Sequence, residues 1–205
     1  MGEIVPLSPR HSLAVAALHM RYLTTPFRGA PGWRLLSAYY QAVAQGDGAV
    51  GYVAEDSDRI LGFICGVWEP FDLRARLLST QWPSLALWGP ISVLLQPQLV
   101  AKFLQKPDES AQKDGAQPLE GYELRPIVVD PVARGTGLAS RLVERLVLDA
   151  HDRGFGRIHL FVDVENQVAR AFYRKMGFVA TNNLQQYGST AARFESYERS
   201  LTSLV

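Results

Sequence analysis

Residues Glu123 to Ala139 read ELRPIVVDPVARGTGLA, and this stretch leads from a predicted β-strand through a basic, glycine-bearing turn into a predicted helix. The first N–H groups of a helix have no partner within the helix, and the helix dipole gives that end a partial positive charge. Gly135 and Gly137 permit close approach to these groups, and Arg134 adds a full charge. The stretch therefore predicts an anion site suited to a pyrophosphate.

This junction resembles that of the GNAT acetyltransferases, which carry Arg or Gln, two residues, Gly, one residue, and Gly or Ala at this place. Arg134, Gly137 and Ala139 stand in that order. The resemblance continues at residues 161–178, FVDVENQVARAFYRKMGF, which is similar to the family's second signature of a strand, Asn, a helix and a closing Tyr, Gly and Phe. It covers residues 121–180 well, and the N-terminal half only in the order of its elements.

The resemblance implies acetyl-CoA as co-substrate and an N-acetyltransferase that acts by direct transfer in a ternary complex. It implies a primary amine of a small molecule, such as an amino sugar or an amino acid, as acceptor. A catalytically inactive acyl-CoA-binding sensor or scaffold, and a protein N-terminal or lysine acetyltransferase, are the alternatives. The implied cofactor contacts are Ile127, Val128, Val129, Arg134, Gly135, Thr136, Gly137, Leu138, Ala139, Ser140, Asn166, Ala169 and Phe172.

Two side chains are predicted to be catalytic. A lysine-like amine is protonated at neutral pH, so a base must remove its proton before it attacks. Glu123 begins the cofactor strand and matches the position where several family members place a glutamate; water, Glu165 or Asp163 are the alternatives. Tyr173 suits the departing thiolate, because a neutral hydroxyl can supply a proton or a hydrogen bond.

No metal is expected in this chemistry. The four histidines show no ligand spacing and are interpreted as surface or packing residues: His11, His19, His151 and His159.

A dinucleotide-binding βαβ unit is the competing interpretation, because Gly135-Thr136-Gly137 is followed by a helix, a strand and Asp163. Ser140 occupies the third glycine position, and the acidic residue lies further on than the usual gap of about 20 residues. After residue 121 the chain also holds too few helices for a doubly wound sheet. The sequence therefore favours the acetyltransferase.

The predicted fold class is α/β (α+β), a GNAT fold with a mixed, mostly antiparallel sheet of about seven strands flanked by helices, in a single domain over residues 1–205. Leu13, Ala16, Ala17 and Met20 are expected to share the buried face of the first helix. Strands are predicted at residues 3–7, 49–55, 59–68, 121–129, 157–163, 178–187 and 191–199. Helices are predicted at residues 12–23, 33–45, 137–153 and 167–176.

A helical insertion is predicted at residues 70–118, between the third and fourth strands, broken by prolines at positions 83, 90 and 97. Its apolar content permits a pocket wall for the acceptor, a subunit interface or a patch that touches a membrane. A homodimer through this insertion or through the closing strands is a related possibility. Candidate acceptor contacts in the first helical region are Tyr22, Phe27, Arg28, Trp33 and Tyr39.

Composition narrows the class of protein. A formal net charge of +1 gives no electrostatic footprint for binding nucleic acid. The single cysteine, Cys65, excludes an internal disulfide and lies in an apolar run, so we expect a buried thiol. The N-terminus lacks the basic and apolar segments of a secretory signal, and the most apolar window, residues 82–95, is too short to span a bilayer. We therefore expect a cytoplasmic protein without a membrane span.

Overall fold

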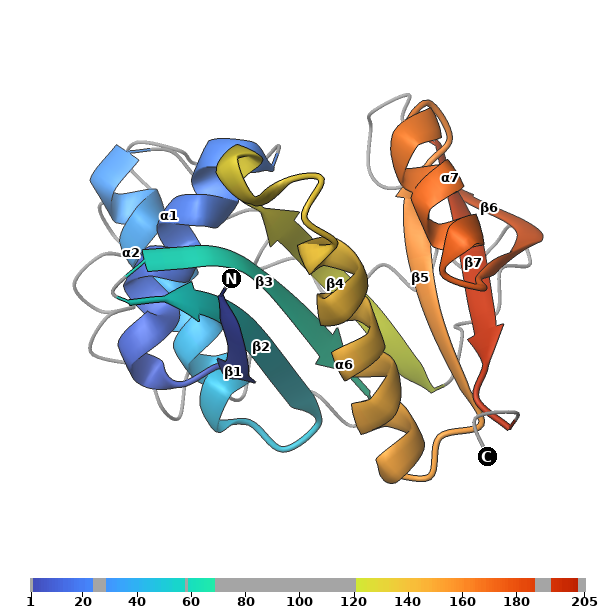
Figure 1. Cartoon of the computed structure of the whole chain (residues 1–205), viewed down its shortest axis with the longest axis horizontal. Coiled ribbons are helices and arrows are strands. Elements are labelled where there is room, and N and C mark those ends of the chain that lie inside the picture. Colours follow the sequence, from blue (N-terminus) through green and yellow to red (C-terminus); the bar gives the residue numbers. More distant parts are fainter. Residues whose placement is uncertain (1, 24–28, 58, 69–120, 187–192, 203–205) are drawn as a thin grey trace.

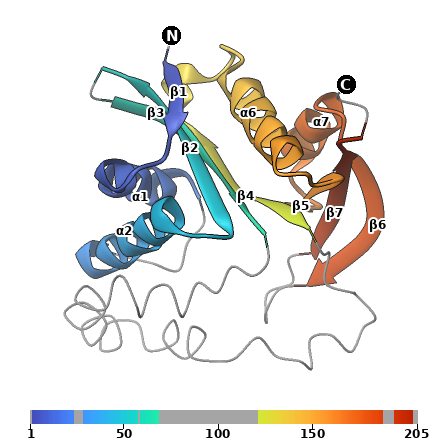
Figure 2. The same cartoon turned by 90° about the horizontal axis from the view of Figure 1, so that it is seen from below.

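The computed structural model describes residues 2–23, 29–57, 59–68, 121–186 and 193–202. The predicted insertion, Phe27 and Arg28 lie outside these residues. The described strands form one seven-stranded sheet in the order β1-β2-β3-β4-β5-β7-β6 (Figure 1). Helices α1 and α2 cover one face of this sheet, and helices α6 and α7 cover the other (Figure 2).

The elements agree with the predicted ones to within a few residues. The largest difference is the start of α2, at Gly29 instead of residue 33. The strands are β1 (Glu3–Pro6), β2 (Ala49–Asp56), β3 (Arg59–Val67), β4 (Tyr122–Val129), β5 (Arg157–Asp163), β6 (Val179–Gln186) and β7 (Arg193–Ser200). The helices are η1 (Pro9–His11), α1 (Ser12–Tyr22), α2 (Gly29–Gln45), η3 (Pro131–Ala133), α6 (Leu138–Asp152) and α7 (Gln167–Lys175).

Strand direction decides between the two folds that the sequence permits. All neighbouring pairs in the sheet are antiparallel except β4 and β5, which are parallel. This confirms the mixed, mostly antiparallel sheet. It excludes the doubly wound parallel sheet that a dinucleotide-binding unit requires.

Each face of the sheet carries its own apolar core. On one face, Leu142 and Leu146 of α6 share a core cluster with Ile158 of β5. On the other face, Tyr40 of α2 packs edge-to-face on Phe63 of β3, with ring centroids 5.2 Å apart. Cys65 belongs to this second core, and burial raises the pKa of its thiol to about 12. The prediction of a buried structural thiol is confirmed.

The predicted buried face of α1 is wrong in part. Leu13 is 38% exposed and Ala17 is exposed, whereas Val15 and Ala16 are completely buried. Apolar residues occupy most sides of this helix, so their spacing alone does not select the face that packs. The polar first residue instead lies inward, where the buried Ser12 hydroxyl donates to a backbone carbonyl of η1 at 2.8 Å.

A buried carboxylate joins α6 to the sheet. Asp149 accepts hydrogen bonds from the hydroxyls of Tyr52 at 2.8 Å and Tyr122 at 2.9 Å, and from Arg153 at 2.6 and 3.2 Å. Trp68 stacks on Tyr122 from the end of β3, with ring centroids 5.2 Å apart. Burial alone would raise the pKa of Asp149, but these hydrogen bonds lower it. The residue is therefore a charged anchor within the apolar face of α6.

Candidate active site

Strands β4 and β5 separate immediately after they pair. Their ladder contains Tyr122 opposite Ile158 and Glu123 opposite His159, and no later pair in the described chain. Beyond this ladder β4 and β5 diverge, as Figure 1 shows. The edge of β4 that faces β5 therefore offers backbone N–H and C=O groups that an extended ligand can pair with as an added strand.

A β-bulge lies at the start of this divergence. The register between β3 and β4 shifts between Ile64 and Gly66. The opposing segment of β4 includes Pro126, which has no N–H to donate to the ladder. Before the bulge Leu124 lies in the first core cluster, and after it Val128 lies in the second. Bulges bend the strand that carries them, and here the bend accompanies the separation from β5.

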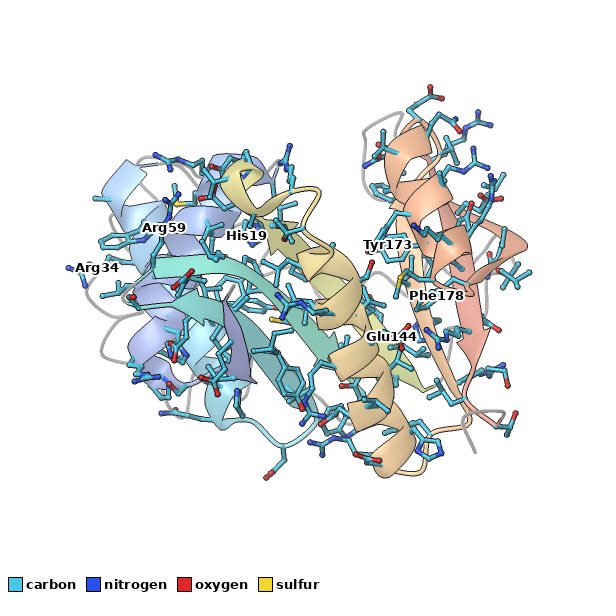
Figure 3. The ribbon with its side chains drawn as sticks, in the orientation of Figure 1. His19, Arg34, Arg59, Glu144, Tyr173 and Phe178 are labelled. Atoms are coloured by element: carbon cyan, nitrogen blue, oxygen red, sulfur yellow. The ribbon has the colours of Figure 1, made fainter. Side chains whose placement is uncertain are left out.

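The turn after β4 is shaped by Asp130. Its backbone N–H donates to the Leu61 carbonyl at 2.8 Å. Its buried carboxylate accepts the Val132 N–H at 3.1 Å and an Arg59 N–H at 2.9 Å. The Val132 hydrogen bond, followed by the Arg59 interactions, lowers the pKa of Asp130 although burial opposes ionisation. Arg59 extends from the sheet toward this turn in Figure 3.

The glycine turn is open to solvent. Gly135 and Gly137 have φ values of 76° and 79°, and no atom lies within 4 Å of the place where a Cβ would stand on either. Gly137 is the N-cap of α6 and gives no side-chain cap, so the first N–H groups of the helix remain free. Thr136 holds the turn by donating to the Ala133 carbonyl at 2.7 Å, and Arg134 is exposed. The turn can therefore accept an anion.

The second signature lies on the far side of the divergence, on α7. Asn166 caps this helix by accepting the Ala169 N–H at 3.0 Å, which uses its side-chain oxygen. Ala169 and Phe172 pack against the first core cluster and are only partly buried. The predicted cofactor residues thus lie on both sides of the separated strands, with β4 and the turn on one side and α7 on the other (Figure 1).

Tyr173 faces inward from α7. It is 7% exposed, and its ring lies 5.2 Å from Phe172 and 5.6 Å from Phe178. In Figure 3 its ring extends toward α6. Burial raises the pKa of its hydroxyl, which has no hydrogen-bond partner among the described residues. The group is therefore a neutral phenol with a free donor.

Glu123 lies at the paired end of the divergence. It faces away from the first core, because its neighbour Tyr122 lies in that core and strand side chains alternate. Its carboxylate accepts a hydrogen bond from Arg125 at 3.0 Å. Asp163 and the following Glu165 lie at the other end of β5, about 13 Å along the strand from the Glu123 pairing position at ~3.3 Å per residue. Of the three carboxylates, Glu123 alone lies where β4 and β5 still pair.

The candidate acceptor residues differ in their surroundings. Trp33 donates its indole N–H to the Leu13 carbonyl at 3.0 Å, so it links α2 to α1. Tyr22 lies with its ring 5.9 Å from the Arg134 guanidinium, next to the glycine turn. Burial is the main cause of the raised pKa of Tyr39. The negative charge of Glu123 also raises this pKa, so the two side chains are close to each other. Tyr39 is therefore the described candidate with a link to Glu123.

The histidines do not share one environment. His11 pairs with Glu55 at 3.2 Å, His19 hydrogen-bonds the Tyr40 hydroxyl at 2.6 Å, and His151 is partly exposed. His159 differs, because it is buried and its Nδ1 has no partner. Its burial agrees with the interpretation of the histidines as surface or packing residues, whereas the missing partner of Nδ1 cannot be predicted from the sequence.

The described residues contain neither a cluster of metal ligands nor a helix that could cross a membrane. Within these residues, no group of three or more His, Cys, Asp or Glu side chains could hold a metal ion. No helix among them is long and apolar enough to cross a membrane.

Comparison with known proteins identifies related sequences. A family model described as the acetyltransferase (GNAT) family matches residues 13–178. The mycothiol acetyltransferase of Beutenbergia cavernae is 39% identical over 117 residues, which are 57% of this chain and 36% of that protein. N-alpha-acetyltransferase MAK3 of Arabidopsis thaliana is 34% identical over 74 residues, 36% of this chain and 38% of that protein. The chain thus spans about a third of the length of these curated relatives.

A solved structure supports the same fold. Arabidopsis thaliana NAA60 in complex with acetyl-CoA aligns with a TM-score of 0.60 at 16% identity, over 98% of this chain and 98% of that one. At this identity the likeness shows a shared fold.

Proposed function

The chain belongs to the GNAT acetyltransferase family, and from this premise we propose that it moves an acetyl group from acetyl-CoA to the primary amine of a small molecule, by direct transfer in a ternary complex. One observation carries the proposal. The open edge of β4 ends at Val129, and the short helix η3 then leads the chain into the uncapped glycine turn at the start of α6. A long ligand with amides at one end and a diphosphate at the other suits this surface.

The described residues fit coenzyme A. The free N–H groups from Gly135 to Ser140 would hold the diphosphate, with Arg134 beside them. The backbone of β4 from Ile127 to Val129 would pair with the amides of the pantetheine arm. The amide nitrogen of Asn166 and the partly buried faces of Ala169 and Phe172 would contact it from α7. When bound, acetyl-CoA supplies the acetyl group as an activated thioester.

Two side chains would carry out the proton transfers. Glu123 would take the proton of the acceptor amine, which frees the lone pair of its nitrogen. Tyr173 would donate a hydrogen bond or a proton to the departing sulfur, and its raised pKa keeps the donor proton in place at neutral pH. Glu123 on β4 faces away from the first core, whereas Tyr173 on α7 lies in that core, so the reacting groups would have to lie between the separated strands to meet both residues.

The class of acceptor has two candidates. A relative of this chain is named for mycothiol, which supports a small-molecule amine. A shorter match to a protein named as an N-alpha-acetyltransferase supports a protein N-terminus as the second candidate. Because the chain spans about a third of either relative, each name supports a class of amine and no specific acceptor.

A thiol-release assay with acetyl-CoA tests this proposal. The amines would be amino sugars, amino acids and short peptides with free N-termini, and CoA-induced thermal stabilisation would be measured beside them. We expect stabilisation by CoA and thiol release with one of the small amines. Release with peptides alone would assign the protein N-terminal alternative. Stabilisation without release would assign an inactive acyl-CoA-binding module, and the absence of both would overturn the proposal.

A further inference from the structure

Three residues on neighbouring strands form one row across the sheet. Glu123 on β4 pairs with His159 on β5, and His159 pairs with Glu198 on β7. Tyr122 and Ile158, the preceding pair, both lie in the first core cluster. Side chains alternate along a strand, so the row of Glu123, His159 and Glu198 lies on the opposite face, the one that carries α1 and α2. Neighbouring strands are about 4.8 Å apart, which places adjacent side chains of the row within reach of each other.

His159 lacks a partner in this row. The residue is 3% exposed, and its buried Nδ1 makes no hydrogen bond. Burial, with smaller contributions from Arg157 and Arg125, lowers the pKa of His159 to about 4. The imidazole is therefore neutral at pH 7, and in the tautomer with the proton on Nε2 its Nδ1 is a hydrogen-bond acceptor. Buried acceptors without a donor are uncommon, and each one needs an explanation.

The two carboxylates beside His159 have no proton to donate to it, and the nearby Arg125 and Arg157 each pair with one of those carboxylates. Glu123 is a carboxylate that accepts from Arg125 at 3.0 Å, and a carboxylate has no proton to donate. Glu198, on the other side of the row, lies 3.9 Å from Arg157. On the helix side, Tyr39 contributes a phenol near Glu123. Of these groups, Glu123 is the one that would gain a proton, and with it a donor, if it acts as the proposed base.

We propose that His159 is a positioning residue for Glu123, whose carboxyl group donates a hydrogen bond to Nδ1 of His159 after it has taken the proton of the acceptor amine. This inference rests on the proposed function. The N–H bond of the ammonium group breaks, its electron pair stays on nitrogen, and the proton forms an O–H bond on Glu123. That O–H then has an acceptor on the neighbouring strand, so the protonated form of the base is stabilised and its proton affinity rises.

Kinetics against pH measure this effect. The acid limb of kcat/KM for the amine follows protonation of the base, so His159→Phe should move that limb to lower pH by about one unit and lower kcat about tenfold. His159→Asn keeps an acceptor oxygen near the position of Nδ1. Its acid limb and its kcat should therefore lie close to those of the unmodified protein. The acceptor in these measurements is the amine that gives the fastest thiol release among the amino sugars, amino acids and peptides of the thiol-release assay.

A matched control lies on the same face of the sheet. Ser196 is also completely buried, its Oγ also lacks a partner, and it pairs with Phe161, which is two residues along β5 from His159. Ser196→Ala should leave the acid limb unchanged. An acid limb in His159→Phe that superimposes on that of the unmodified protein would overturn the proposal, as would an equal shift in all three variants. Failure of the proposed function would show earlier, as no thiol release by the unmodified protein.

A second measurement needs no acceptor. Glu123→Gln places an amide N–H donor where the protonated carboxyl would stand, so the ¹⁵N signal of His159 Nδ1 should move in the direction of an accepted hydrogen bond. Glu123→Ala provides no donor and should leave that signal unmoved. Equal signals in the Gln and Ala variants would contradict the proposed contact, and this outcome does not depend on whether the protein binds CoA.

Discussion

Arg59 on β3 donates a hydrogen bond to the buried carboxylate of Asp130 at 2.9 Å, and so connects the β2–β3 hairpin to the turn that leads into α6. The same carboxylate accepts the Val132 N–H at 3.1 Å. Asp130 therefore fixes both the start of η3 and the direction in which the chain enters the glycine turn. The geometry of the proposed diphosphate site depends on a residue that does not belong to the site.

The first prediction follows from that pair. Asp130→Asn removes the charge that Arg59 binds, so the turn should loosen and the Kd for CoA should rise about tenfold, equivalent to ~1.4 kcal/mol. Arg59→Gln should have a smaller effect, because the Arg59 side chain is 58% exposed. Isothermal titration with CoA measures both. Equal CoA affinity in Asp130→Asn and the unmodified protein would show that the carboxylate does not shape the site.

The second prediction distinguishes the effect of backbone strain on stability from the effect of a blocked turn on CoA binding. Gly137 at the start of α6 and Gly154 just after its end have φ values of 79° and 84°, with nothing within 4 Å of a Cβ on either. Alanine at either position should cost about 1 kcal/mol of unfolding free energy. Only Gly137→Ala should weaken CoA binding as well. If both variants bind CoA as the unmodified protein does, the turn does not hold the cofactor.

The third prediction concerns Tyr173. Tyr173→Phe keeps the ring contacts with Phe172 and Phe178 and removes only the hydroxyl. We expect kcat to fall at least tenfold while the KM for acetyl-CoA changes little, because the group acts on the departing sulfur. Steady-state kinetics with the identified amine measure this. An unchanged kcat would remove Tyr173 from the mechanism.

The fourth prediction concerns acid stability. The folded state holds the pKa of Asp149 below its ordinary value. Its stabilising effect is therefore fully present above the unfolded pKa near 3.9, and it is lost as pH falls through the folded pKa. Asp149→Asn should lower the unfolding free energy at pH 7 by about 2 kcal/mol. The difference from the unmodified protein should shrink below pH 4.

A neighbour on α6 provides the control for that variant. The Asp152 side chain is 71% exposed, so Asp152→Asn should change stability by less than about 0.5 kcal/mol. Urea unfolding at several pH values measures both variants. If Asp149→Asn and Asp152→Asn behave alike at pH 7, the buried anchor does not contribute to stability.

Much of the fold could be predicted from periodicity and glycine positions. The strand at residues 157–163 has the predicted bounds, because mostly apolar residues lie between Arg157, which follows Gly156, and Asp163. The helix that follows the glycine turn was expected because its apolar stripe is strong. The face of α1 was not predictable in the same way, because Leu13 and Val15 are equally apolar and only one of them packs.

The parts that could not be predicted depend on pairs far apart in the chain. Asp149 appears as an ordinary helical carboxylate until Tyr52, 97 positions away, is placed beside it. The proposed role of His159 could not be predicted, because it depends on the strand register that places His159 next to Glu123. The glycine turn itself was predictable, because its free N–H groups follow from local chain geometry alone.

The most direct test of the central claim is the backbone amide NMR spectrum of the protein titrated with CoA. If exposed N–H groups at the start of α6 hold the diphosphate, the largest shifts should occur from Gly135 to Ser140, with smaller ones along β4 from Ile127 to Val129. Unmoved amides from Gly135 to Ser140 at millimolar CoA would contradict the account.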